Sequence, residues 1–132
     1  MFDAVWSAVV CGQYQHHRAV LTGYSRHSVR GELYPALVSS NKPGKFVEGR
    51  LYRDVSPEDL RRLDTFEGGE YQRIDCQVTT FAATFAATSL DTLSAQVYLF
   101  LKPELLLPQD WDAAQFAATG IEPFLASYAP KP

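Results

Sequence analysis

The chain has 132 residues, of which 46% are hydrophobic and 20% charged, and its formal net charge is −3. This size and composition predict one globular domain, residues 1–132, with a core of its own. Acids and bases are mixed along the chain, which argues against nucleic acid or a membrane surface as partner. The longest apolar stretches are too short to span a bilayer, and no basic segment precedes an apolar run at the N-terminus.

The cysteines and histidines give no sign of a metal site. Cys11 and Cys76 lie far apart, form no CxxC motif and have no histidine at metal-ligand spacing. We therefore expect reduced thiols in a cytoplasmic protein. His16 and His17 are adjacent and cannot face the same way on a regular element, and His27 has no evident partner. We expect all three histidines to be exposed or on edge strands.

The first half of the chain predicts one helix followed by strands. Phe2, Val5, Trp6 and Val9 recur on one helical face, and Gly12 ends the pattern. The extended segments that follow are Arg18–Val29 with a bend at Gly23, Leu33–Val38, and Phe46–Val55, with a turn at 41–44. Because Pro35 removes a backbone donor, the second of these is expected to be an edge or irregular strand.

The clearest local signal is a helix start at Ser56. Ser56 can cap the helix, Pro57 fits its first position, and two acids follow in the first turn. The helix is expected to run to about Phe66 or Glu67, where Gly68 and the glycine after it end it.

The second half predicts two further strands and two short helices. The expected elements are a strand at Tyr71–Phe81, an Ala/Thr/Ser-rich hairpin loop at 82–93, a strand at Ala95–Leu101, a loop bracketed by Pro103 and Pro108, helices at Trp111–Ala118 and Ile121–Tyr128, and a loose tail at 129–132. Strands with one well-marked helix between them indicate an α+β fold with a largely antiparallel or mixed sheet.

Glu67 is the residue best placed for chemistry. At roughly 100° per residue it falls between Leu60 and Leu63 on the apolar face of the capped helix. It also lies at the helix C-terminus, where the dipole is negative. Burial and the dipole both disfavour the charged carboxylate and should raise its pKa, which suits a group that takes and returns protons near neutral pH.

Other interpretations of these residues remain open. Glu67 can also rotate to solvent or pair with Arg73. Tyr34, Tyr71 and Tyr98 lie in or beside expected strands, where tyrosines pack half-buried or line a polar pocket with their hydroxyls. No serine or cysteine lies in a nucleophile elbow, and there is no glycine-rich phosphate loop.

Several segments together resemble the gamma-glutamylcyclotransferase-like family, most closely its gamma-glutamylamine cyclotransferase and plant avirulence-induced branch. The segments, in order, are LTGY at 21–24, YPALV at 34–38, VEGRLY at 47–52, VSPEDL at 55–60, LDTFEGGEYQR at 63–73 and AQVY at 95–98. The segment at 63–73 resembles the family's most telling motif.

This resemblance implies a small mixed β-barrel with flanking short helices. It also implies cleavage of a γ-glutamyl amide, in which the substrate's α-amine closes the ring of 5-oxoproline and expels an amine. Glu67 matches the family's glutamate, which would move the proton, and Tyr34, Tyr71 and Tyr98 are candidate substrate-binding residues. The resemblance implies no metal or organic cofactor.

One part of the family pattern is missing. The family begins with a strand that ends in tyrosine-glycine-serine/threonine-leucine, whose backbone N–H groups hold the substrate. Here Met1 and Phe2 match the residues just after that loop. We therefore expect Met1 to be an internal methionine of an N-terminally incomplete domain. Two alternatives remain: a non-catalytic module that binds a small molecule or a partner on the same scaffold, and a carboxylate-dependent hydrolase.

Overall fold

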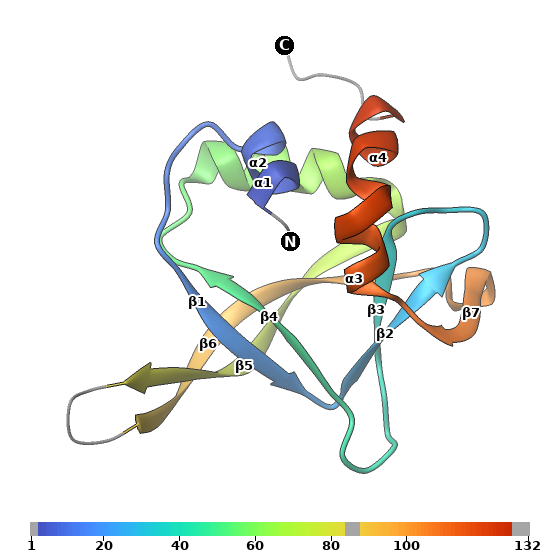
Figure 1. Cartoon of the computed structure of the whole chain (residues 1–132). Helices are drawn as coiled ribbons and strands as arrows, with labels where there is room; N and C mark the ends of the chain where they lie inside the picture. Colours follow the sequence, from blue (N-terminus) through green and yellow to red (C-terminus); the bar gives the residue numbers. More distant parts are fainter. Residues whose placement is uncertain (1–2, 84–87, 128–132) are drawn as a thin grey trace.

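The computed structural model describes residues 3–83 and 88–127, which form two antiparallel sheets curled into a half-barrel with short helices around it (Figure 1). The chain runs through α1 (Asp3–Val9), β1 (His16–Thr22), β2 (Tyr24–Val29), β3 (Pro35–Ser39), β4 (Phe46–Tyr52), α2 (Pro57–Glu67), β5 (Tyr71–Ala83), β6 (Thr88–Phe100), β7 (Leu106–Asp110), α3 (Ala113–Gln115) and α4 (Ile121–Ser127). The expected α+β fold with flanking short helices is confirmed, and the expected small mixed β-barrel is seen as a half-barrel of antiparallel strands.

One long extended segment contributes to both sheets. The larger sheet has the order β4-β1-β5-β6, and the smaller sheet has the order β3-β2-β7. Gly23 joins β1 to β2 with a φ of +86°, a left-handed conformation that glycine adopts without steric cost. The predicted bend at Gly23 is therefore confirmed. Pro35 begins β3 at the edge of the smaller sheet, as expected.

Three groups of buried apolar side chains hold these layers together. Ala19, Leu21, Leu37 and Val78 form the interior of the half-barrel. The other two groups consist of Val9, Val10 and Leu63 between α1 and α2, and of Val29, Ala36 and Phe100 beside the smaller sheet. Helix α2 is thereby fixed over the larger sheet, with α1 beside it (Figure 1).

Two predicted loops were wrong. The segment at 82–93 is mostly strand, because β5 continues to Ala83 and β6 begins at Thr88, with these two residues paired. Cross-strand pairing, rather than a local pattern, stabilises this two-stranded arm; residues 84–87 lie outside the described residues. The segment between Pro103 and Pro108 is a 3-10 turn followed by β7. Strand β7 lies at the edge of the smaller sheet, so its outer side has no partner strand. The missing N–H of Pro108 therefore removes no ladder hydrogen bond on that side.

The third extended segment ends earlier than expected. Strand β4 stops at Tyr52 rather than at Val55. Asp54 has a φ of +57°, which breaks the extended conformation and is tolerated by aspartate better than by most residues.

The cysteines and histidines lie apart from one another. Cys11 is exposed, Cys76 is half-buried, and neither forms a disulfide within residues 3–83 and 88–127. His16 and His17 are exposed on β1, as expected. For His27 the expectation was wrong, because it is half-buried on β2, the central strand of the smaller sheet. It also has a partner, since its Nε2 lies 2.8 Å from Ser25 Oγ on the same face of β2. Across the described ranges we found no cluster of metal-binding side chains and no helix long and apolar enough to cross a membrane.

The two helices expected at the C-terminus form one continuous helical segment. It starts after Asp112, whose side chain accepts a hydrogen bond from the Gln115 N–H at 2.9 Å, and passes through a π-helical turn at Phe116–Gly120 into α4. Tyr128 and the expected tail at 129–132 lie outside the described residues. Gly120 is buried, and a Cβ added to it would lie 2.6 Å from the ring of Phe116.

We predict that Gly120→Ala destabilises the protein by about 1–2 kcal/mol, because the strain of overpacking exceeds the gain in helix propensity. Urea unfolding followed by circular dichroism measures the change. Gly69→Ala is the matched control, since its added Cβ meets no atom within 4 Å. Equal midpoints for the two variants would show that Phe116 moves aside without cost.

Candidate functional site

Glu67 is the last residue of α2, and the local sequence explains its position. The helix starts as predicted, with Ser56 Oγ accepting a hydrogen bond from the Asp59 N–H at 3.1 Å. It ends at Gly68, which has a φ of +75° and donates its N–H to the carbonyl of Asp64. Leu63 on the inner face is buried, and Glu67, one turn later on that face, is half-buried.

Burial changes the acidity of this carboxyl. Desolvation raises the pKa of Glu67 from 4.5 to about 7. A carboxyl with this pKa is present in both protonation states near neutral pH. It can therefore accept a proton and return it with little cost in either direction.

The hydroxyls of Tyr71 and Tyr98 lie within the electrostatic reach of Glu67. Burial raises the pKa of both tyrosines, and the charge of Glu67 adds to that shift in each case. The Tyr71 hydroxyl donates to the carbonyl of Pro35 at 2.8 Å, and the Tyr98 hydroxyl donates to Asp64 Oδ1 at 2.5 Å. Both phenols thus stay protonated, and each is held by a hydrogen bond to the protein.

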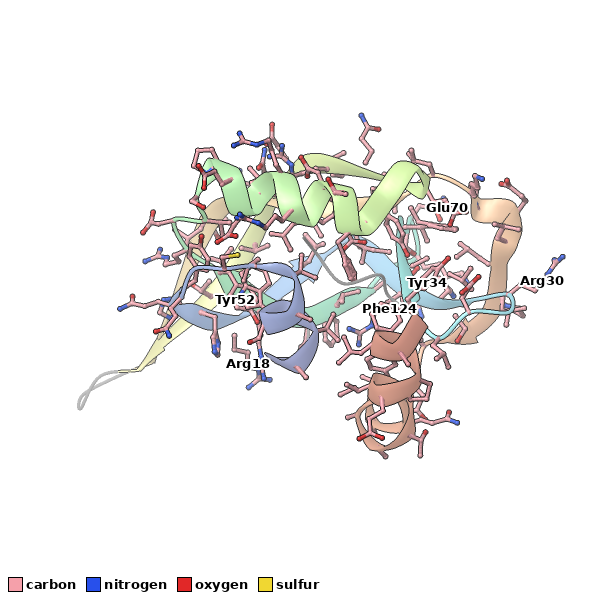
Figure 2. All side chains as sticks on the ribbon, turned by 90° about the horizontal axis from the view of Figure 1, so that it is seen from above. Arg18, Arg30, Tyr34, Tyr52, Glu70 and Phe124 are labelled. Carbon is pink, nitrogen blue, oxygen red and sulfur yellow. The ribbon has the colours of Figure 1, made fainter. Side chains whose placement is uncertain are left out.

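Tyr34 lies beside Tyr71. Burial raises the pKa of Tyr34 to about 12, and the negative charges of Glu32 and Glu70 add to this shift. The Tyr34 hydroxyl donates to Glu70 Oε2 at 3.3 Å. Its ring makes edge contacts with Tyr71 and with Phe124 of α4, with centroids 6.3 and 6.5 Å apart. Figure 2 shows Tyr34 and Phe124 next to each other near the C-terminal end of α2.

Phe124 is a residue that the sequence did not point to. Its ring lies 5.8 Å from that of Phe66, the residue before Glu67, and 5.8 Å from that of Phe116. The C-terminal helical segment thus supplies an apolar wall beside the end of α2. Nothing local in the sequence connects the end of α2 with a phenylalanine far along the chain, so only the fold reveals this contact.

The alternative that Glu67 pairs with Arg73 is wrong. The Arg73 guanidinium binds both oxygens of Asp64, at 3.0 and 3.2 Å, and reaches Gln96 Oε1 at 2.6 Å. Among residues 3–83 and 88–127, no ion pair involves Glu67. The raised pKa of Glu67 is consistent with a carboxyl that lacks a neighbouring guanidinium.

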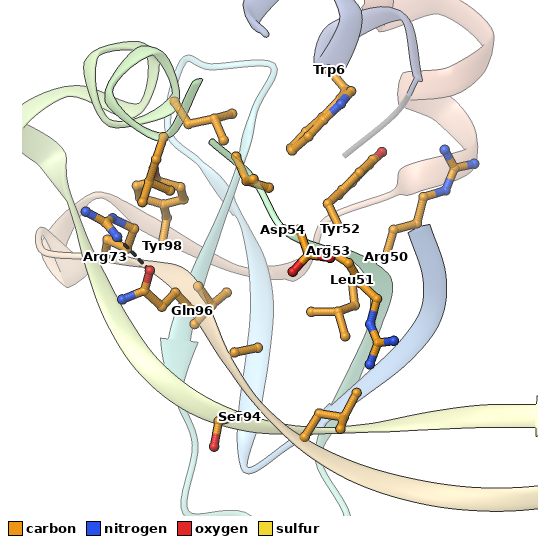
Figure 3. A pocket seen from close by; sticks show the side chains of 16 residues that line it. Trp6, Arg50, Leu51, Tyr52, Arg53, Asp54, Arg73, Ser94, Gln96 and Tyr98 are labelled. Atoms are coloured by element: carbon orange, nitrogen blue, oxygen red, sulfur yellow. Dashed lines mark hydrogen bonds between the residues drawn. The ribbon is translucent and has the colours of Figure 1, made fainter. Parts of the chain in front are cut away.

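A cavity of about 800 Å³ opens next to these residues, between β4 and β6 (Figure 3). Tyr98 lines it together with Leu60, Leu63 and Arg73, whereas Glu67, Tyr34 and Tyr71 do not. The structure therefore places the four predicted site residues around the end of α2, but only one of them lines the cavity. Tyr98 faces the cavity, and the other two tyrosines pack on the side of Phe124.

Asp59 is a buried carboxylate whose role the sequence did not reveal. It is 2% exposed and accepts hydrogen bonds from the Cys11 and Gly12 N–H groups, both at 2.9 Å, and from the Tyr14 hydroxyl at 2.6 Å. It also pairs with Arg62 at 2.8 Å. The Tyr14 hydrogen bond in particular holds the pKa of Asp59 well below its usual range. Asp59 thus ties the segment after α1 to the start of α2.

We predict that Glu67→Gln makes the protein more stable at pH 8 than the wild type. The pKa of Glu67 is about 7 when folded and near 4.5 when unfolded, so the wild-type protein loses stability as pH rises through this interval. The loss is about 3–4 kcal/mol at roughly 1.4 kcal/mol per pKa unit, and glutamine avoids it.

Urea unfolding at pH 5 and pH 8 measures this difference. Glu58→Gln is the control, because Glu58 is exposed in the first turn of the same helix and its loss should leave the wild-type pH profile unchanged. Parallel profiles for the wild type and Glu67→Gln would mean that Glu67 is solvated in the folded protein.

Comparisons of the sequence with known proteins show which proteins this chain is similar to. The sequence profile described as gamma-glutamyl cyclotransferase, AIG2-like, matches residues 2–113. Protein AIG2 C of Arabidopsis thaliana is 28% identical over 111 residues, which are 83% of this chain and 62% of that protein. AIG2-like protein D of the same plant is 30% identical over 110 residues, or 81% of this chain and 66% of that protein. The chain thus spans less than two thirds of the length of these curated relatives.

The fold is found in a solved structure as well. A solution structure of an Arabidopsis thaliana protein superposes with a TM-score of 0.66 and 24% identity, covering 96% of this chain and 73% of the other. At this identity the likeness concerns the fold alone.

Proposed function

Because the chain belongs to the AIG2-like gamma-glutamyl cyclotransferase family, we propose that this domain cleaves a γ-glutamyl amide by intramolecular cyclisation, with Glu67 as acid and base. The observation that carries the proposal is the half-buried carboxyl at the end of α2, whose pKa is about 7 and which lies in the segment that resembles the family's main motif.

In the proposed reaction the Glu67 carboxylate takes a proton from the substrate's α-ammonium. The freed amine attacks the γ-carbonyl carbon, and the new C–N bond closes the five-membered ring. The old amide C–N bond then breaks, and Glu67 passes the two protons that the attacking nitrogen loses, one after the other, to the departing nitrogen, so that the amine leaves as its ammonium ion. No water is consumed, and the entropic cost of bringing the reactants together is small because both belong to one molecule.

The tyrosines are proposed to bind the substrate. With raised pKa values, Tyr34, Tyr71 and Tyr98 stay protonated at neutral pH. A substrate carboxylate or carbonyl oxygen would accept their hydrogen bonds in place of the present acceptors, which are Glu70, the carbonyl of Pro35 and Asp64. Tyr71 and Tyr98 both lie within the electrostatic reach of Glu67, so a glutamyl group bound by their hydroxyls would lie beside the carboxyl. The chemistry calls for no cofactor, and we expect it in the cytoplasm.

A second candidate is a module that binds but does not catalyse. The observation that favours it is the division of the site, since the cavity of about 800 Å³ is lined by Tyr98 but not by Glu67. Such a module binds γ-glutamyl compounds without turnover, also when any further segment of the domain is present.

A panel of γ-glutamyl amides, assayed for 5-oxoproline in water enriched in ¹⁸O, separates the possibilities. The panel includes amides of amino acids, of the lysine ε-amine and of small amines. A cyclotransferase releases 5-oxoproline without ¹⁸O, a hydrolase releases glutamate with ¹⁸O in its γ-carboxyl, and a binding module releases neither. Labelled glutamate as the sole product, or no product from any amide, would overturn the proposal.

A further inference from the structure

A second cavity, of about 420 Å³, lies where the turn between β3 and β4 meets β2. This turn is at the bottom of Figure 1, whereas α2 lies at the top. The cavity has no described lining residue in common with the larger cavity beside Tyr98, and neither Glu67 nor any of the three site tyrosines lines it. It is therefore a separate site, which the proposed reaction does not use.

One wall of this cavity is polar although it belongs to a strand face that is apolar farther along. Ser25 and His27 lie on the same face of β2, and His27 pairs with Ala36, which is fully buried in the core. The Nδ1 atom of His27 is buried and has no hydrogen-bond partner within residues 3–83 and 88–127. When the Ser25 hydroxyl donates to Nε2 of His27, Nδ1 carries the ring proton and can donate it to a ligand. A ligand that accepts this hydrogen bond removes the cost of an unpaired buried group.

Two lysines give the cavity a positive charge. Lys42 and the half-buried Lys45 line it, and neither forms an ion pair within the described part of the chain. None of the described lining residues is acidic. Asp110 of β7 is the strand partner of His27, and its side chain lies outside those described. Because two lysine charges outweigh one carboxylate, the balance is positive in a protein whose net charge is −3.

The turn that carries the lysines is held at both ends by the residue that joins β1 to β2. The Gly23 N–H donates to the carbonyl of Lys45 at 3.0 Å, and the Ser40 N–H donates to the carbonyl of Gly23 at 2.9 Å. Between these ends, the Lys42 N–H donates to Ser40 Oγ at 3.3 Å. Because these hydrogen bonds fix the backbone beside the cavity, less conformational entropy is lost when the lysines bind a ligand.

We propose that this cavity binds a phosphate group through Lys42 and Lys45, either as free phosphate or as the phosphate of a small organic ester. A phosphate monoester carries roughly −1.5 to −2 charges at pH 7, which two lysines balance. Its three terminal oxygens accept more hydrogen bonds than a carboxylate, and Ser39, Ser40 and Asn41 add donors to the lining. The volume also leaves room for a small organic group, since pockets for small molecules begin at roughly 300 Å³.

An NMR titration of the 132-residue chain tests this proposal without any γ-glutamyl compound. Inorganic phosphate and glycerol 3-phosphate are added at constant ionic strength, with acetate as the control anion. Both phosphates should cause saturable shifts of backbone amides, confined to residues 23–27 and 38–45. Tighter binding of glycerol 3-phosphate assigns the site to an ester, and equal binding assigns it to free phosphate. Shifts that do not saturate, or equal shifts with acetate, contradict the proposal.

Charge variants show whether the cavity itself binds the phosphate. Lys45→Gln should weaken the binding of inorganic phosphate at least about tenfold, and Lys45→Arg, which keeps the charge, should retain most of the affinity. Lys42→Gln changes an exposed residue of the turn and should weaken binding as well, which keeps the test valid if Lys45→Gln does not fold. Lys102→Gln is the matched control, because Lys102 pairs with Glu70 and does not line the cavity. If Lys102→Gln weakens binding as much as the other two variants, or if these bind like the wild type, the proposal is wrong; neither result bears on Glu67.

Discussion

Asp59→Ala is expected to destabilise the protein by about 3–5 kcal/mol, a large fraction of the stability of a small domain. The carboxylate of Asp59 is buried and satisfies two backbone N–H groups, the Tyr14 hydroxyl and the Arg62 guanidinium. Alanine would leave these donors without their acceptor at the place where the segment after α1 meets α2. Thermal and urea unfolding followed by circular dichroism measure the loss.

The exposed neighbour Glu58 is the control for this prediction. Glu58→Ala removes an acid from the same helical turn without removing a buried partner, so its effect should stay within about 0.5 kcal/mol. Asp59→Asn keeps the shape of the side chain but loses the charge, and should fall between the two. A loss below about 1 kcal/mol for Asp59→Ala would mean that water replaces the carboxylate.

Helix α2 shows what the sequence could predict. Its start, its end and the inward direction of Glu67 follow from signals within a few residues: the cap at Ser56, the proline after it and the glycine pair after Glu67. The same holds for the bend at Gly23 and the edge strand that begins with Pro35. In each case the deciding interaction is local, so periodicity and turn chemistry are sufficient.

The partners of the site residues could not be predicted, because they come from distant parts of the chain. Tyr14 reaches Asp59 across 45 positions, Tyr98 reaches Asp64 across 34, and Phe124 packs on Tyr34. The β5–β6 arm was mistaken for a loop for a related reason. Its alanines and threonines carry no strong alternation, and cross-strand pairing, which no local pattern encodes, stabilises it.

The division of the predicted site is the main new information. A sequence motif can place Glu67 and Tyr71 near each other, but it does not show which side chains line a cavity. In the structure Tyr98 lines the cavity of about 800 Å³ and also lies within the electrostatic reach of Glu67, so a molecule bound in the cavity would change the surroundings of the carboxyl.

Glu67→Gln is expected to lower kcat by about 10²–10⁴-fold in any form of the protein that releases 5-oxoproline from a γ-glutamyl amide. Glutamine keeps the shape and hydrogen-bonding capacity of the side chain but cannot carry the proton from the α-ammonium to the leaving nitrogen. KM should change little, because proton transfer is needed for the reaction and not for substrate binding. Initial rates over a range of substrate concentrations give both constants.

The pH profile makes this prediction specific to proton transfer. The base must be ionised in the free enzyme, so kcat/KM of the wild type should rise as pH increases through about 7, the pKa of Glu67. Glu70→Gln is the control, since Glu70 accepts a hydrogen bond from Tyr34 at the rim of the same site and should keep this profile with a modest change in KM. A Glu67→Gln variant that retains wild-type kcat would remove Glu67 from the mechanism.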